Sequence, residues 1–409
     1  MLATAEKVLH WPFSRTMHGR PPVEFDLLRT ESACPVLLPA GATESRRAWL
    51  VTAYDDVRQA LADPRLSADE VRPGAPVRIQ VPPGERPSSF LRMDDPDHAR
   101  LRSMITSEFT AHRARAVRPV VQQRIDDLLD ILAASPGAAD LQQVFTRALP
   151  TMIIAGILGV PTADTGNFVE LTRTVLSQDD PMVAFAAYQQ ITQYLRDLAV
   201  SKLAEPGEDL MSRVATKHVR TGHLTIDQLV GIARLVLIAG HETTTNQLAL
   251  NVLSLLLDAN LRAQVLTDGG AKIGQYVEEA MRYWSISQDA ILRQATVDLE
   301  LGGVQMRAGD AVVISIPAAN NDPAMFADQD VIRLDRDSGK HLQWGYGPHF
   351  CLGAPLARLE MELALRSLFE RFPSLALAVD DPAPLYRTDT IFFGVKTLPV
   401  TWDPELPRR

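Results

Sequence analysis

The 409-residue sequence contains only two cysteines, Cys34 and Cys351, and they lie far apart. Two cysteines at this separation provide no disulfide framework of the kind that stabilises small secreted proteins. Export is not expected either, because Glu6 and Lys7 interrupt what would have to be the apolar stretch of a signal within residues 1–13. We therefore expect a cytoplasmic protein in which one thiol is free for chemistry.

Long apolar runs, an excess of basic residues and internal repeats are also absent. No stretch reaches the roughly 18 uninterrupted apolar residues that a membrane helix needs, so we expect a soluble protein without membrane contact. Lysine and arginine number 41 against 50 aspartates and glutamates, and the net charge of -9 argues against a general nucleic-acid binder. Proline and glycine are dispersed rather than gathered into linkers. These features predict one continuous domain over residues 1–409, which we expect to be a monomer.

Apolar residues recur at helical spacing in three long segments, residues 97–134, 164–204 and 225–258. Thr225 and Gln228 form a capping-box pattern at the start of the third, which at about 1.5 Å per residue is long enough to cross the whole domain. Strand patterns occur at residues 48–52, 297–306, 311–316, 391–394 and 399–401, the second with a Gly302-Gly303 hairpin turn. Residues 71–92 predict a long loop, which in compact domains is often a lid over a site. The predicted fold is therefore mainly α-helical, with small β-sheets beside a helical body.

The segment from Trp344 to Pro355 predicts a glycine-bent loop that enters a helix. Pro355 suits the first helical turn, because the backbone N–H that proline lacks would have no partner there. The buried face of this helix is predicted to consist of Leu356, Leu359, Leu363 and Phe369. Cys351 then lies at a helix N-terminus, where N–H groups and the helix dipole stabilise a thiolate and the glycines let the backbone approach a flat ligand. Position alone leaves a buried structural cysteine as an equally open alternative.

A second unusual segment, Ala239-Gly240-His241-Glu242-Thr243-Thr244, lies in the middle of the predicted long helix. A glycine, an acid and an alcohol interrupt an otherwise apolar surface there. One interpretation is a helix kink in which the hydroxyl of Thr243 donates to the carbonyl of Ala239. His241 lies about 100° around the helix from Gly240, so we expect it at the surface or in a supporting role rather than as a metal ligand.

Two further pairs of residues share helix faces. Glu279 and Arg282 stand three residues apart in the predicted helix 275–284 and can pair, although such pairs on surface helices contribute little. His98 and Arg102 stand four apart in the first predicted helical segment, so both can donate to one anion. The alternative for either of these two is a solvated helix edge.

The cysteine segment resembles that of the cytochrome P450 family, whose pattern is Phe-x-x-Gly-x-x-x-Cys-x-Gly. This sequence supplies Gly347, Cys351 and Gly353, and it departs at the first position, where Trp344 stands in place of phenylalanine. An aromatic ring is kept, so we expect it to pack beside the thiolate with a different electronic influence on the sulfur. The resemblance covers nearly the whole chain, because the other motifs follow in the family's order.

The resemblance implies haem b as the cofactor, enclosed between the long helix and the cysteine loop, with Cys351 as the iron ligand. It implies an oxygen groove in which Ala239 and Gly240 leave space. His98, Arg102, Arg293 and His349 are implied to bind the two propionates. The full set of implied haem contacts is His98, Arg102, Ala239, Gly240, Arg293, Trp344, Gly345, His349, Cys351 and Gly353.

The resemblance also assigns roles outside the immediate haem contacts. Glu242 and Thr243 are implied to be the catalytic pair that manages protons. Glu279, Arg282 and Arg336 are implied to be structural, supporting the cysteine loop from behind.

By the same resemblance, the protein is expected to activate dioxygen with two electrons and two protons, and by default to hydroxylate a mid-sized organic molecule of secondary metabolism. Electrons are expected from a separate ferredoxin or flavodoxin with its NAD(P)H reductase, docked near Cys351 on basic residues such as Arg113, Arg115, Arg358 and Arg366. Oxidative coupling, epoxidation, desaturation and a peroxide-driven peroxygenase are the alternatives. Substrate contacts are expected from Leu235, Ile238, Ala290, Ile291, Ile391 and Phe392.

Overall fold

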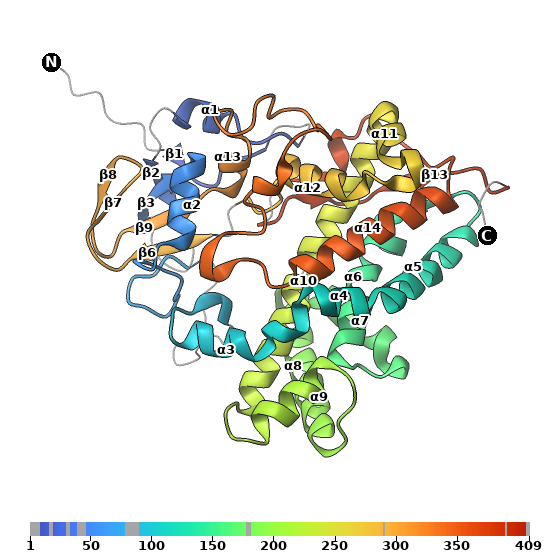
Figure 1. Ribbon diagram of the computed structural model, residues 1–409, viewed down its shortest axis with the longest axis horizontal. Coiled ribbons are helices and arrows are strands. Elements are labelled where there is room, and N and C mark those ends of the chain that lie inside the picture. Colours follow the sequence, from blue (N-terminus) through green and yellow to red (C-terminus); the bar gives the residue numbers. More distant parts are fainter. Residues whose placement is uncertain are drawn as a thin grey trace.

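The computed structural model describes residues 9–15, 19–29, 33–38, 46–77, 90–176, 181–288, 291–388 and 391–405. Helices make up most of the molecule, and the largest sheet lies at one side of them (Figure 1). The predicted fold class, mainly α-helical with small sheets, is confirmed. None of the helices in the described ranges combines the length and the hydropathy that a membrane span requires.

The long helix α10 (Ile226–Leu257) runs through the middle of the helical body (Figure 1). It begins with the predicted capping box, because Thr225 Oγ1 accepts from the backbone N–H of Gln228 and the side chain of Gln228 accepts from that of Thr225. This arrangement satisfies two N–H groups that the first helical turn leaves without partners. The prediction of one uninterrupted helix over this segment is confirmed.

The other two segments with helical spacing are also helical, and the first of them is divided into three helices. Residues 97–134 form α3 (Asp97–Thr106), α4 (Ala111–Ala116) and α5 (Arg118–Ala133). Thr110 is extended and caps α4 with its side chain, so the chain changes direction there. Residues 164–204 form α7 (Thr165–Leu176) and α8 (Pro181–Ala204), in which proline occupies the first position of the second helix.

Of the remaining α-helices, α6, α8, α12 and α14 pack directly against α10, whereas α1, α2 and α13 lie beside the largest sheet (Figure 1). Their bounds are α1 (Glu24–Leu28), α2 (Tyr54–Ala62), α6 (Ala148–Leu158), α9 (Leu210–Val214), α11 (Ala259–Gly270), α12 (Ile273–Trp284), α13 (Ile316–Asn320) and α14 (Ala354–Arg371). The predicted helix 275–284 is α12, and the helix predicted after the cysteine segment is α14.

The largest sheet has six strands in the order β1-β2-β3-β9-β6-β4. Its members are β1 (Leu9–His10), β2 (Ala33–Leu38), β3 (Arg46–Val51), β4 (Leu66–Ser67), β6 (Leu292–Ala295) and β9 (Ala311–Ile314). β3 and β9 correspond to predicted strands, but β9 ends at Ile314 because the side chain of Ser315 caps α13. Cys34 lies buried in β2, which the sequence analysis did not predict.

Three smaller sheets complete the described fold. β7 (Leu299–Leu301) and β8 (Val304–Met306) form the predicted hairpin, with Gly302 and Gly303 both at positive φ in the turn. β13 (Pro399–Thr401) is as predicted and lies between β5 (Ala138–Asp140) and β10 (Ala376–Leu377). The strand prediction for residues 391–394 was wrong: β12 (Gly394–Val395) begins at its last residue and pairs with β11 (Tyr386–Arg387). In the predicted loop 71–92, residues 71–77 are neither helix nor strand and Phe90–Arg92 form a 3-10 turn, while 78–89 lie outside the described residues.

A buried arginine near the N-terminus joins segments that are distant in sequence. Arg15 donates through Nη2 to the carbonyl of Ser285 at 2.6 Å and through Nε to Oε1 of Gln288 at 3.0 Å. Its guanidinium carbon also lies 4.2 Å from the ring centroid of Phe393. Burial lowers the pKa of Arg15 to about 9. The segment following α12 and the segment preceding β12 are therefore held together by a cation from the first residues of the chain.

Candidate functional site

The cysteine loop folds as the positions of its glycines predict. The backbone N–H of Cys351 donates to the carbonyl of Trp344 at 2.7 Å, which closes the loop. Gly345 and Gly347 have φ of 75° and 73°, a region that favours glycine. A Cβ on Gly347 would also lie 3.0 Å from the Cα of Ala62 in α2, so a side chain there would push the loop away from that helix.

The helix that follows, α14, begins three residues after Cys351. Its predicted apolar face is buried, with Leu356, Leu359, Leu363 and Phe369 all less than a tenth exposed. Burial raises the pKa of the Cys351 thiol, while the backbone N–H groups at the start of α14 and nearby arginines lower it. Because burial opposes the ionisation that these groups favour, the thiol needs a bound metal cation to be fully deprotonated. Of the two cysteines, Cys34 is the buried structural one and Cys351 is partly accessible.

The four residues expected to bind carboxylates come together from three separate segments. The rings of His98 in α3 and His349 in the cysteine loop lie 4.2 Å apart, centroid to centroid. Burial lowers the pKa of His349 to about 3, and the charges of Arg293, His98 and Arg102 contribute in the same direction. Four nitrogen-bearing side chains therefore converge where a negatively charged group would be stabilised.

Three observations test whether these residues fit haem. Nε2 of His98 is buried and has no hydrogen-bond partner in the described protein, which is costly unless a ligand supplies one. Arg293 is half-buried, and among the described residues no carboxylate lies within ion-pair distance of it, although burial lowers its pKa to about 10. A Cβ on Gly353 would meet no protein atom within 4 Å, so packing within the described protein does not require glycine there. A free thiol, unpaired donors and an open glycine are the features that a flat, iron-containing dianion requires, so the residues fit haem.

The middle of α10 is accessible although both its flanks are buried. Ala239 is exposed, and Glu242 and Thr243 are partly exposed, whereas residues 244–255 are buried. The hydroxyl of Thr243 donates to the carbonyl of Ala239 at 2.7 Å, as the kink interpretation expected, but α10 continues without a break. Gly240 also meets α6, because a Cβ there would lie 2.7 Å from Cδ1 of Ile154.

His241 is buried against α6, so of the two positions expected for it the surface one is wrong and the supporting one agrees with the structure. Its Nδ1 forms a short hydrogen bond with the hydroxyl of Thr151. Burial lowers the pKa of His241 to about 4, which keeps the ring neutral near neutral pH. The ring supports the α10–α6 contact, because Thr151 lies on α6.

The acid of the predicted catalytic pair has a partner that sequence reasoning missed. Arg387 on β11 forms an ion pair with Oε1 of Glu242. Asn246, one turn further along α10, donates to the same oxygen at 3.1 Å. Gly394 on β12 allows this contact, because a Cβ there would lie 2.0 Å from Oδ1 of Asn246. The Glu242–Asn246 spacing of four residues is a sequence signal for that half of the cluster, whereas nothing in the sequence indicates Arg387.

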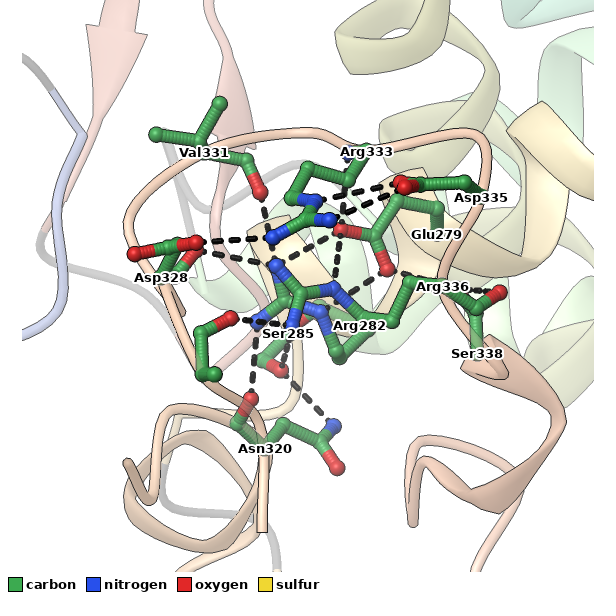
Figure 2. A network of polar contacts seen from close by, with 11 residues as sticks. Glu279, Arg282, Ser285, Asn320, Asp328, Val331, Arg333, Asp335, Arg336 and Ser338 are labelled. Atoms are coloured by element: carbon green, nitrogen blue, oxygen red, sulfur yellow. Dashed lines mark hydrogen bonds and ion pairs between the residues drawn. The ribbon is translucent and has the colours of Figure 1, made fainter. Parts of the chain in front are cut away.

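Glu279 and Arg282 are fully buried and, with the partly buried Arg336, form the centre of a polar network (Figure 2). Arg282 donates twice to Glu279 at 2.9 Å, and Arg336 donates to it at 3.0 Å. Burial alone would raise the pKa of the Glu279 carboxyl, but Arg282, Ser338 and the backbone N–H of Arg333 hold it below its usual value. The network extends toward the cysteine loop, because Arg282 bonds to Asn320 and Asn320 accepts from the backbone N–H of Leu342 at 2.7 Å.

The predicted substrate contacts fall in two groups. Leu235 and Ile238 lie on α10 near Ala239 and are partly exposed. Ile391 and Phe392 are partly exposed in a second group. Their segment meets the one after α12, since the backbone N–H of Gln288 donates to the carbonyl of Ile391 and Ser287 pairs with Phe392. Ile291 is half-buried beside them in sequence, and Ala290 lies outside the described residues.

Comparison with known proteins agrees with this geometry. The family model of cytochrome P450 matches residues 43–204 and 272–402. Cytochrome P450-SU2 of Streptomyces griseolus is 40% identical over 362 residues, which cover 87% of each chain. The crystal structure of cytochrome P450 MoxA from Nonomuraea recticatena matches with a TM-score of 0.91 and 35% identity, covering 97% of this chain and 98% of that chain. That of the mycinamicin VIII C21 methyl hydroxylase MycCI from Micromonospora griseorubida matches with a TM-score of 0.88 and 34% identity, covering 97% and 100%. The chain therefore belongs to the cytochrome P450 family and is a monooxygenase with haem b as its cofactor.

Proposed function

We propose that this monooxygenase hydroxylates a mid-sized organic molecule of secondary metabolism with electrons from a separate ferredoxin or flavodoxin and its NAD(P)H reductase. The observation that carries the proposal is the position of Glu242 and Thr243. Both are accessible in the middle of a helix whose flanks are buried, on the element that the family places over the haem. A hydroxylating cytochrome P450 needs a controlled proton supply there.

Each residue of the site has a defined task in this proposal. Cys351 binds the iron, and His98, Arg102, Arg293 and His349 bind the propionates. Bound in this way, haem b supplies the activation of dioxygen. Glu242 passes protons from solvent toward the hydroxyl of Thr243, which gives up its bond to Ala239 when it donates elsewhere.

The electron donor is proposed to dock around α4, which packs against α14 on the cysteine side of the molecule. Arg115 is exposed, and Arg113 is half-exposed beside Glu108. Arg358 and Arg366, which the sequence suggested for the same surface, also have internal partners: Arg358 binds Glu278, and Arg366 donates to a backbone carbonyl. Docking is therefore proposed to depend mainly on α4, since charges already paired inside the protein contribute less to partner binding.

The substrate proposal depends on the relatives. MycCI hydroxylates a methyl group of mycinamicin VIII, and it matches this chain over nearly its whole length. The segments that meet at Gln288 and Ile391 contain no motif that indicates a particular substrate. The substrate class is therefore proposed from the relatives alone.

A screen for compounds that shift the Soret band of the purified haem protein, followed by turnover of the compounds that bind, tests the proposal. We expect a hydroxylated product with NADPH, ferredoxin and reductase, and little product with hydrogen peroxide alone. A higher rate with peroxide than with the electron-transfer partners would favour the peroxygenase alternative. Products of coupling, desaturation or epoxidation would contradict hydroxylation while keeping the monooxygenase class.

A further inference from the structure

The helix α12 carries two adjacent carboxylates, Glu278 and Glu279, and only the second belongs to the network in Figure 2. Consecutive residues project about 100° apart around a helix, so the two carboxylates reach different parts of the protein. Glu278 accepts from Arg358 of α14 at 2.7 and 3.0 Å. Its Oε2 also lies 3.3 Å from Nε2 of His341, just before the cysteine loop. Glu278 is therefore placed between the two ends of the segment that contains Cys351.

The third group at Glu278 is Trp344, the residue at which this chain departs from the family pattern. Nε1 of Trp344 lies 3.4 Å from Oε2 of Glu278, and Trp344 is 8% exposed. A buried tryptophan N–H usually has an acceptor, and phenylalanine at the same position would have no N–H to donate. The guanidinium of Arg358 lies 4.8 Å from the centroid of the indole, so the ring is held at its edge and on its face.

The contacts of Trp344 are transmitted to Cys351 through the backbone. The carbonyl of Trp344 accepts the N–H of Cys351 at 2.7 Å, so a shift of Trp344 changes where the sulfur lies. Glu278 also controls charge near the sulfur. Burial alone would raise the pKa of its carboxyl, but His341 and Arg358 lower it to about 2, so the group is an anion that balances Arg358. Arg358 is one of the cations that act on the thiol of Cys351.

We propose that Trp344 and Glu278 act together as positioning residues for Cys351. The indole–carboxylate link fixes the start of the cysteine loop to α12, while the negative charge of Glu278 balances Arg358 and so sets the reduction potential of the bound haem. This inference rests on the proposed role of Cys351 as the iron ligand. It predicts that Trp344 helps to position Cys351 only when Glu278 is present to accept its N–H.

The test compares Trp344→Phe, Glu278→Gln and the double variant as purified haem proteins. The first measurement is the rate at which the ferrous carbon-monoxide form loses the red-shifted Soret band of thiolate ligation. We expect each single variant to lose it several-fold faster than the parent. The double variant should be no faster than Glu278→Gln, because both changes remove the same link.

The second measurement is the haem reduction potential. A looser cysteine loop alone would not shift this potential in a defined direction, whereas a change of charge would. Glu278→Gln should raise the potential, because it leaves the Arg358 cation unbalanced and so favours the reduced iron. Trp344→Phe should change it less, since no charge is removed. Asp130→Asn is the matched control, because it removes the carboxylate partner of Arg371 at the far end of α14.

Additive rates in the double variant, or an unchanged potential in Glu278→Gln, would overturn the inference. If Glu278→Gln does not fold, Glu278→Asp replaces it, with the potential expected near that of the parent and the band lost faster. Either failure leaves the haem-thiolate assignment intact, because that assignment is tested in the parent protein. A parent that never shows the thiolate-type band would instead contradict the role of Cys351 itself.

Discussion

Replacing Arg293 with alanine should have opposite effects on the protein with and without haem. In the described protein no carboxylate lies within ion-pair distance of this arginine, and its guanidinium donates only to the carbonyl of Leu292. A half-buried cation without an ion-pair partner is unfavourable, and burial lowers the pKa of Arg293 although the charge of Asp94 acts in the opposite direction. We therefore expect Arg293→Ala to leave the apoprotein as stable as the parent, or more stable, and to weaken the retention of haem.

The expected change in the rate of haem release depends on how deeply each propionate-binding arginine is buried. Charge-assisted hydrogen bonds contribute about 1.5–3 kcal/mol, and about 1.4 kcal/mol corresponds to a tenfold change in an equilibrium. Arg293 belongs at the upper end, so its loss should speed haem release about 100-fold. Arg102 also donates to the carbonyl of Phe350 and is less buried, so Arg102→Ala should speed release only about tenfold.

The assay is the transfer of haem to an excess of apomyoglobin, with thermal unfolding of the apoproteins measured in parallel. Arg100→Ala is the control, because Arg100 shares α3 with Arg102 but pairs at the surface with Asp97. Unchanged release from Arg293→Ala, or a clearly less stable apoprotein, would show that the arginine supports the fold instead of binding haem.

Three further outcomes follow from contacts around α10. Thr243→Ala should keep the rate of NADPH consumption but divert electrons to hydrogen peroxide, with product per NADPH falling several-fold; full coupling would leave Thr243 with only its bond to Ala239. Arg387→Met should lower kcat and change its pH profile without altering haem retention, because it frees the Glu242 carboxylate; an unchanged profile would exclude a role in proton supply. The pKa of His241 is about 4 in the folded protein against an ordinary 6.5, so folding stability should fall as pH drops from about 6.5 to 4, by up to about 3 kcal/mol. The thermal unfolding temperature of His241→Asn should depend less on pH in this range than that of the parent. An equal dependence in both proteins would show that folding does not lower the pKa of this ring.

The cysteine loop could be anticipated because its conformation is determined locally. Gly345 and Gly347 occupy backbone conformations that favour glycine, and the apolar spacing after Pro355 specifies one buried helix face. The capping box of α10 was predictable for the same reason, since both of its residues lie within one helical turn. Local chemistry was therefore sufficient wherever the interacting groups are neighbours in the sequence.

Contacts between distant segments could not be predicted. Helical periodicity continues through Thr110, so it gives no sign that residues 97–134 are divided into shorter helices. The contact of Gly240 with Ile154 on α6, 86 positions earlier, likewise has no sequence signal. The Glu242–Arg387 ion pair joins residues 145 positions apart, and no spacing rule connects them. For Trp344, by contrast, the need of a buried indole N–H for an acceptor was a usable signal, and Glu278 is that acceptor.

The buried Arg15 has a consequence for exchanging parts between relatives of this enzyme. One guanidinium serves the beginning of the chain, the stretch after α12 at Ser285 and Gln288, and the stretch before β12 at Phe393. A chimera that takes its C-terminal quarter from a relative would keep Arg15 and receive the relative's residue at the position of Phe393. A chimera that takes only its N-terminus from a relative would keep Phe393 and receive the relative's residue at the position of Arg15. We therefore expect a chimera to keep all the contacts of Arg15 only when the residues at these three stretches are compatible with one another.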